Sequence, residues 1–184
     1  AAYKSMNNDM FKMTGNDAAT AKRKMEVAFS IENQIAKVSY DQVKSRDPQA
    51  NYHPMTWDQF VKSYPGVDWN YLLKASGYPN NGGKVDVGQP EPVHEVEKIL
   101  ATASLDALKA YMELAVISSS AGMLSDNFTD RNFEYKKVAY GVQQQQPRWK
   151  RALAFVQGIM GEAVGKLYVQ KYFPESSKQR MITL

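Results

Sequence analysis

Apolar residues recur every three or four positions along most of this chain, which is the spacing of helices that bury one face. The first such stripe follows Asn16-Asp17, whose side chains can cap free backbone N–H groups. Pro48 restricts its predecessor and cannot extend the hydrogen-bond ladder, so this helix is expected to end by Asp47. The inward positions predicted for it are Met25, Ala28, Ile31, Ile35 and Val38.

The middle of the chain predicts short helices around one strand. Thr56 and Asp68 are each placed to cap a short helix. Residues 79–83, Pro-Asn-Asn-Gly-Gly, predict a turn because Asn and Gly tolerate positive φ. Residues 84–88 alternate polar and apolar side chains and predict the only strand, after which a helix is expected at 93–101.

Two helices are predicted between residues 104 and 141. Ser104 is placed to cap the first, and Ser125 or Asp126 starts the second, which is expected to end at Gly141. The inward positions predicted for the first are Leu105, Leu108, Met112 and Ala115, and those for the second are Phe128, Tyr135 and Ala139.

The most regular stripe begins at Pro147, in the first turn of a predicted helix. Gly161 and Gly165 lie four apart on this helix and predict close packing on a soluble neighbour. A last helix is expected from Pro174-Glu175 to Leu184, and the lack of a stop signal there indicates truncation. The inward positions of the long helix are predicted to be Trp149, Leu153, Val156, Met160, Ala163 and Leu167.

These elements predict a mainly α fold, a multi-helix array with one short β element, in a single helical domain over residues 1–184. With 43% hydrophobic and 23% charged residues, the chain is typical of a globular protein. It has no cysteine, which excludes disulfides, cysteine zinc sites, iron–sulfur clusters and thiol nucleophiles. No apolar run reaches the roughly 18 residues that span a bilayer.

The net charge is +4, and the basic residues gather at Lys22–Lys24 and Arg148–Arg151. Acidic residues lie near both clusters, so solvated helix faces are favoured over a nucleic-acid patch. We therefore expect no nucleic-acid partner.

The candidate chemistry of the chain is sparse. Residues 94–98, His-Glu-Val-Glu-Lys, begin like the H-E-x-x-H helix of zinc peptidases, but Lys98 has no lone pair for a metal. The only other histidine, His53, lies in a predicted loop far away in sequence, where packing or solvent exposure is the usual role. Residues 118–120, a run of three serines, have no partner base nearby. The residues thus predict no catalytic and no metal-binding group in this chain, and they assign no substrate-binding residue.

Several segments together resemble the N-terminal region of the M13 zinc metallopeptidases, the neprilysin and endothelin-converting-enzyme family with its bacterial PepO relatives. Residues 46–56, Arg-Asp-Pro-Gln-Ala-Asn-Tyr-His-Pro-Met-Thr, are similar to the family's R-D-P…Y-N/H-x-M-T segment. Residues 67–69 and 85–90 are similar to its "hydrophobic-D/S-W" and to its short strand before a proline.

The most specific part of the resemblance lies near the end of the chain. It resembles the family's block "Y-G…R-W-K-R-C…A-V-G-x-L-Y-V…Y-F…S-K", and the resemblance as a whole runs from about Asn16 to the last residue. Ala152 stands where many relatives have cysteine, which favours a bacterial member. The matching segments are Tyr140-Gly141, residues 147–151, residues 162–169, residues 172–174 and Ser177-Lys178.

The resemblance implies a peptidase whose catalytic parts lie elsewhere. Family members bind zinc through H-E-x-x-H and the glutamate of E-x-x-x-D, and an N-A-Y/F strand holds the peptide; this chain has none of these motifs. We therefore expect an excised, inactive lid or substrate-chamber segment of a bacterial zinc metalloendopeptidase that hydrolyses oligopeptides. Its expected partners are the catalytic domain of the same polypeptide, which carries the zinc, and oligopeptide substrates. The resemblance favours the cell envelope, periplasm or secretion and leaves the cytoplasm open.

A second hypothesis is a stand-alone helical binding module with an aromatic and basic surface around Trp57, Trp69 and Lys22–Lys24. The flanking reading frame discriminates the two hypotheses. A downstream H-E-x-x-H in frame supports the peptidase, and a stop codon after Leu184 supports the module.

Overall fold

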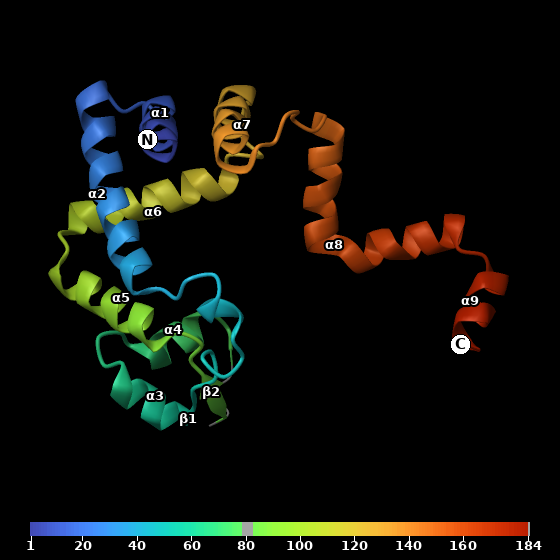
Figure 1. Cartoon of the computed structure of the whole chain (residues 1–184), viewed down its shortest axis with the longest axis horizontal. Helices are drawn as coiled ribbons and strands as arrows, with labels where there is room; N and C mark the ends of the chain where they lie inside the picture. The colour runs from blue at the N-terminus through green and yellow to red at the C-terminus, as the bar shows by residue number, and fades with distance from the viewer. Residues whose placement is uncertain (79–82, 184) are drawn as a thin grey trace. The chain divides into compact units, whose positions relative to one another are not determined.

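The protein is mainly α-helical, as predicted. The computed structural model describes residues 1–78 and 83–183, and within these it has nine α-helices, one 3-10 turn and one two-stranded sheet (Figure 1). The described chain forms two compact units, of which the first holds Ala1 and residues 3–119 and the second holds Ala2 and everything from Ser120. The turn predicted at residues 79–83 lies, except for Gly83, outside the described residues.

The first unit begins with a helix that the sequence pattern did not predict. Helix α1 (Ala2–Met13) buries Met6, Asn7, Met10 and Phe11. The positions 6, 7, 10 and 11 have helical spacing, but polar residues surround them and Asn7 interrupts the apolar pattern. The buried face of α1 can therefore be recognised only from the tertiary structure.

Helix α2 (Ala18–Val38) begins where the capping residues predicted. Both Ala19 and Thr20 donate backbone N–H bonds of 2.9 Å to Asp17 Oδ1. The helix ends at Val38, well before Pro48, and a 3-10 turn, η1 (Lys44–Arg46), follows. Among its predicted inward positions, Met25, Ala28 and Ile31 are buried, and Ile35 and Val38 are half-buried.

The β element has two strands, so the prediction of a single strand was incomplete. Strand β1 (Pro54–Thr56) pairs antiparallel with β2 (Lys84–Asp86), with Met55 opposite Val85. A three-residue strand that starts with proline has no alternation of its own, so only the pairing partner defines it.

Two short helices follow β1, and the first of them packs against this sheet. Helix α3 (Trp57–Ser63) starts with a capping box, in which Gln59 N–H donates to Thr56 Oγ1 and Thr56 N–H donates to Gln59 Oε1. Helix α4 (Trp69–Ala75) is capped by Asp68, whose Oδ1 accepts the Tyr71 N–H at 2.9 Å. Both starts confirm the predicted caps. Figure 1 shows these helices and the sheet beside α5 (Pro90–Thr102), which also packs against α2.

Helix α6 (Leu105–Ser120) starts as predicted but buries another face. Ala110, Leu114 and Ile117 are buried, whereas two predicted inward residues, Leu105 and Met112, are each 66% exposed. Ala115 is exposed and Leu108 half-buried. Apolar residues occupy most of the circumference of this helix, so periodicity alone does not select the buried side.

The described part of the second unit, which ends at residue 183, contains three helices. Helix α7 (Asp126–Tyr140) buries Phe128, leaves Tyr135 half-buried and Ala139 exposed, and ends at Gly141 with φ +69°, a left-handed conformation that favours glycine. Helix α9 (Glu175–Ile182) starts as predicted after Pro174 and ends two residues before Leu184.

Helix α8 (Arg148–Tyr172) has its predicted length but not its predicted burial. No residue of α8 is buried, and Met160 has the non-helical angles φ −126° and ψ 36°, which kink the helix. Leu153 is 43% exposed, and the other residues of the predicted inward stripe are exposed as well. The expected neighbour at Gly161 and Gly165 is also missing from the described chain, because a Cβ built there meets no atom within 4 Å. The inward stripe predicted for α8 was therefore wrong for this chain by itself.

Candidate functional site

The two histidines have separate structural partners. Nδ1 of His53 lies 2.9 Å from the backbone oxygen of Val87, and the His53 N–H donates to Asp86 Oδ1 at 2.7 Å, which ties the loop before β1 to β2. Nδ1 of His94 lies 3.5 Å from Glu97 Oε2 on the same helix. The described residues contain no group of three or more His, Cys, Asp or Glu side chains placed to hold a metal ion.

Glu97 fastens the loop between α3 and α4 to helix α5. This carboxylate is nearly buried and accepts the backbone N–H of Gly66 at 2.7 Å. A Cβ at Gly66 would lie only 2.8 Å from Glu97 Cβ, so the approach requires glycine. The rings of Tyr64 and His94 lie beside this contact, tilted by 37° with centroids 4.6 Å apart. Burial, together with the charges of Glu97 and Glu91, raises the pKa of the Tyr64 hydroxyl.

The two tryptophans of the binding-module hypothesis line one apolar pocket. It has a volume of about 240 Å³. The Trp57 indole N–H donates to Asn70 Oδ1 at 2.8 Å and that of Trp69 donates to the Tyr64 carbonyl at 2.6 Å, so both indole N–H groups are used within the protein. Its lining residues are Trp57, Phe60, Trp69, Leu72, Leu73, Ser76, Tyr78 and Val85.

The basic residues of that hypothesis, Lys22–Lys24, lie on another element. Lys22 and Arg23 are exposed on α2, which does not line the pocket, and Lys24 Nζ forms an ion pair of 2.6 Å with Glu113 of α6. The structure thus brings Trp57 and Trp69 together and leaves Lys22–Lys24 outside their pocket.

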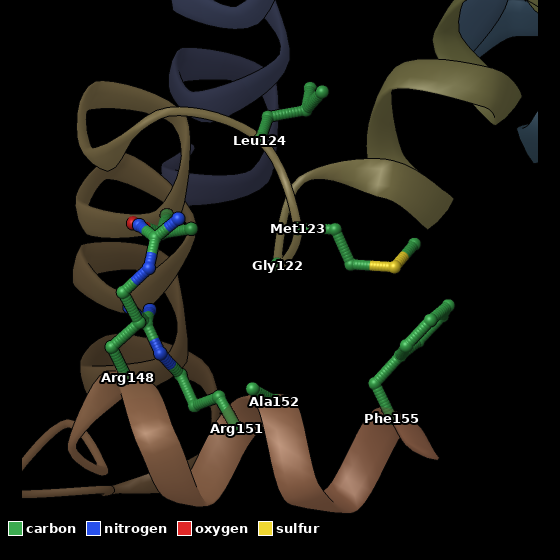
Figure 2. A pocket seen from close by; sticks show the side chains of 8 residues that line it. Gly122, Met123, Leu124, Arg148, Arg151, Ala152 and Phe155 are labelled. Carbon is green, nitrogen blue, oxygen red and sulfur yellow. The ribbon is translucent and has the colours of Figure 1, made fainter.

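A second pocket, of about 210 Å³, lies in the second unit between the α6–α7 turn and the start of α8 (Figure 2). Met123 and Phe155 provide apolar walls, and the side chains of Arg148 and Arg151 extend along one side. Arg148 Nη1 lies 3.4 Å from Asp126 Oδ1. The remaining lining residues are Gly122, Leu124, Thr129 and Ala152.

Residues 148–150 are exposed, as predicted for a solvated helix face, whereas Arg151 is half-buried. Its Nε is shielded from solvent and has no hydrogen-bond partner within the described part of the chain. A basic run beside a Gln-rich loop gives no sign of this pocket, because Met123 and Phe155 are far apart in sequence.

None of the helices in the described ranges is both long and apolar enough to cross a membrane. This agrees with the sequence, where charged residues interrupt the longest helix at both ends.

Comparisons with known sequences and with solved structures find relatives that each match most of this chain. The rat (Rattus norvegicus) endothelin-converting enzyme 1 is 26% identical over 168 residues, which cover 89% of this chain and 22% of that protein. The neutral endopeptidase of Lactobacillus helveticus is 25% identical over 170 residues, covering 92% of this chain and 26% of the relative. The zinc metalloprotease Zmp1 of Mycobacterium tuberculosis in its open state superimposes with a TM-score of 0.90 at 29% identity, covering 99% of this chain and 29% of that structure.

The chain therefore spans less than a third of the length of each of these relatives. The model of the family described as Peptidase family M13 matches residues 1–184 of this chain. The resemblance inferred from the motifs is confirmed, and the chain belongs to peptidase family M13, as part of the N-terminal region of its members.

Proposed function

We propose that this chain is a non-catalytic, helical part of a bacterial zinc metalloendopeptidase, and that it forms a wall of the chamber in which oligopeptides are hydrolysed. The observation that carries the proposal is a family match over residues 1–184 in a sequence without an H-E-x-x-H motif. The relatives include an endopeptidase and a zinc metalloprotease, which supports a peptide hydrolase.

The residues of this chain do not fit a catalytic zinc site. Such a site needs three protein ligands around one ion, whereas the Nδ1 atoms of His53 and His94 face Val87 and Glu97 separately. We therefore assign no catalytic step to this chain. In the proposed enzyme, the zinc and the water that it activates belong to the catalytic domain of the same polypeptide.

The proposal is tested by comparing two proteins, the 184-residue chain and the full product of the reading frame that contains it. The full product is expected to cleave oligopeptides, to lose this activity with a chelator and to regain it with zinc. The chain alone is expected to show no cleavage above background. Chelator-sensitive cleavage by the pure chain, or a full product without zinc-dependent cleavage, would contradict the proposal.

A stand-alone binding module is the second candidate, and the pocket shared by Trp57 and Trp69 favours it. Its natural occupant would be an apolar or aromatic side chain of a peptide, because the indole N–H groups are already bonded. Titration of the chain with aromatic dipeptides should then shift its tryptophan fluorescence, and Leu72→Asp at the rim should abolish the shift. No saturable shift in the unaltered chain would remove this candidate.

We also propose that the enzyme acts in the cell envelope or outside the cell, as the family resemblance favours. Fractionation of the source bacterium with an antibody against this chain tests the location. Recovery in the cytoplasmic fraction alone would contradict it.

A further inference from the structure

Helix α8 contains an uncharged stretch that is exposed around its whole circumference. Residues 152–161 carry no charged side chain, Gln157 is the one polar side chain among them, and every residue of the stretch is exposed. A helix on a protein surface normally turns a polar face to water, whereas a helix that is apolar on all sides is buried. This stretch has the composition of an interior helix.

The two sides of the stretch differ in shape. At 3.6 residues per turn, and before the kink at Met160, the bulky Leu153 and Val156 lie on one side and the small Ala154 and Gly158 lie on another. A Cβ added at Gly158 or Gly161 meets no atom within 4 Å. Glycine within a helix costs about 1 kcal/mol relative to alanine, and nothing in the described chain requires it here. One side thus suits interlocking side chains, and the other suits the close approach of a second backbone.

Arg151 supplies an independent observation at the start of the same helix. Its Nε is shielded from solvent without a hydrogen-bond partner in the described chain, and its side chain lies in the pocket that Phe155 also lines (Figure 2). Shielded N–H donors in folded proteins are nearly always bonded. Within the described part of the chain, the start of α8 therefore carries an unsatisfied donor.

The comparisons indicate what covers the helix. In the relatives, the matching region is 22–29% of the length, so most of their polypeptide lies outside it. The uncharged stretch is also too short to cross a bilayer, which takes about 18 residues or more. We propose that α8 is an interior helix of the whole peptidase, enclosed on both sides by the part of the polypeptide that this chain does not include. The inference rests on the proposed function, because it takes the chain to be part of a longer M13 peptidase.

The test is site-specific thiol labelling, for which the absence of native cysteine from this chain is convenient. Val156→Cys reports on the bulky side and Ala154→Cys on the small side, and Lys136→Cys on the exposed face of α7 is the control. Labelling rates are measured at each site, by peptide mass mapping, in the 184-residue chain and in the full product. We expect the rates at 154 and 156 to fall at least about tenfold in the full product, and the rate at 136 to change little.

Each other outcome overturns the inference. Fast labelling at 154 and 156 in the full product leaves α8 on the surface. Slow labelling in the monomeric chain means that the chain covers α8 itself, and slowing that depends on concentration means that a second copy covers it. A reading frame that stops after Leu184 removes the proposed partner.

Failure here is distinguishable from failure of the proposed function. Zinc-dependent cleavage by a full product in which 154 and 156 label fast would contradict the inference alone. Protection of both sites in a full product without peptidase activity would contradict the proposed function alone.

Discussion

At the scale of single residues, the contact between Gly66 and Glu97 is a tightly constrained feature of the first unit. Glu97 accepts the Gly66 N–H at 2.7 Å, and the space beside Gly66 is filled by the carbon atoms of the same side chain. Tyr64, two residues earlier, is 2% exposed and packs on Phe60 with ring centroids 5.1 Å apart. This short segment therefore holds the aromatic cluster against α5.

Gly66→Ala should destabilise the chain by about 1–3 kcal/mol, because the new Cβ would lie 2.8 Å from Glu97 Cβ, an atom fixed to the backbone. Urea unfolding followed by circular dichroism measures the change. Gly158→Ala is the matched control, since its Cβ meets open space within a helix, and it should be neutral or stabilising by up to about 1 kcal/mol. Equal effects of the two substitutions would contradict the close approach at Gly66.

The raised pKa of Tyr64 predicts that the folded protein loses stability at alkaline pH. Burial, first, and the charges of Glu97 and Glu91 raise the pKa of its hydroxyl above the ordinary value of 10.0. The folded-state pKa is higher than the unfolded-state pKa. The stability contributed by the protonated Tyr64 hydroxyl is therefore complete below pH 10 and is lost as the pH rises through the raised pKa. Tyr64→Phe should make the fall in the free energy of unfolding above pH 10 shallower. An unchanged slope would show that Tyr64 is not the group responsible.

At the scale of elements, local chemistry sets where helices begin. Asp17, Thr56 and Asp68 were each predicted as caps, and each accepts a backbone N–H of the first turn of its helix. Such bonds join residues two or three positions apart, so a short stretch of sequence contains both partners.

The stabilisation of α2 by its Asp17 cap depends on pH. Hydrogen bonds from Thr20, first the backbone N–H and then the hydroxyl, lower the pKa of the Asp17 carboxyl. The stabilisation of α2 is therefore present above the ordinary pKa of 3.8 and is lost as the pH falls through the lowered value.

Asp17→Ala should lower the thermal midpoint at pH 7 and should make the decline below pH 4 less steep. Asp17→Asn keeps an acceptor without the charge, so it should retain most of the cap at pH 7 with a similarly shallow acid profile. Thermal unfolding followed by circular dichroism at several pH values checks both variants. An acid profile for Asp17→Ala like that of the unaltered chain would contradict the assignment.

At the scale of the whole molecule, the exposed apolar surface of α8 makes the effect of one substitution depend on how much of the protein is present. Leu153 is 43% exposed in this chain. Leu153→Ala should therefore cost less than about 1 kcal/mol in the 184-residue chain. In the full product it should cost roughly 2–5 kcal/mol, if further polypeptide buries this side chain as we propose.

Leu114→Ala is the control for that comparison, because Leu114 is 1% exposed on α6 within this chain. It should cost roughly 2–5 kcal/mol in both proteins. Chemical unfolding of the four variants measures the differences. A large cost for Leu153→Ala in the chain alone would mean that α8 is already buried there.

The sequence by itself determined the helical class, most helix starts and the family. Caps, proline stops and the ordered motifs of residues 46–56 and 140–178 are local features, and each can be recognised without knowing what lies across the fold. The stripe of α8 is apolar, as the sequence shows, but the structure leaves it exposed.

Only the tertiary structure decided which faces are buried and which distant residues meet. Helix α6 buries Leu114 rather than Met112, β1 exists because β2 pairs with it, and Trp57 shares a pocket with Trp69. Burial is a relation between surfaces far apart in sequence, so a helix that is apolar on several sides does not itself select one. A cap bond needs only its own helix turn, whereas a core needs every element that covers it.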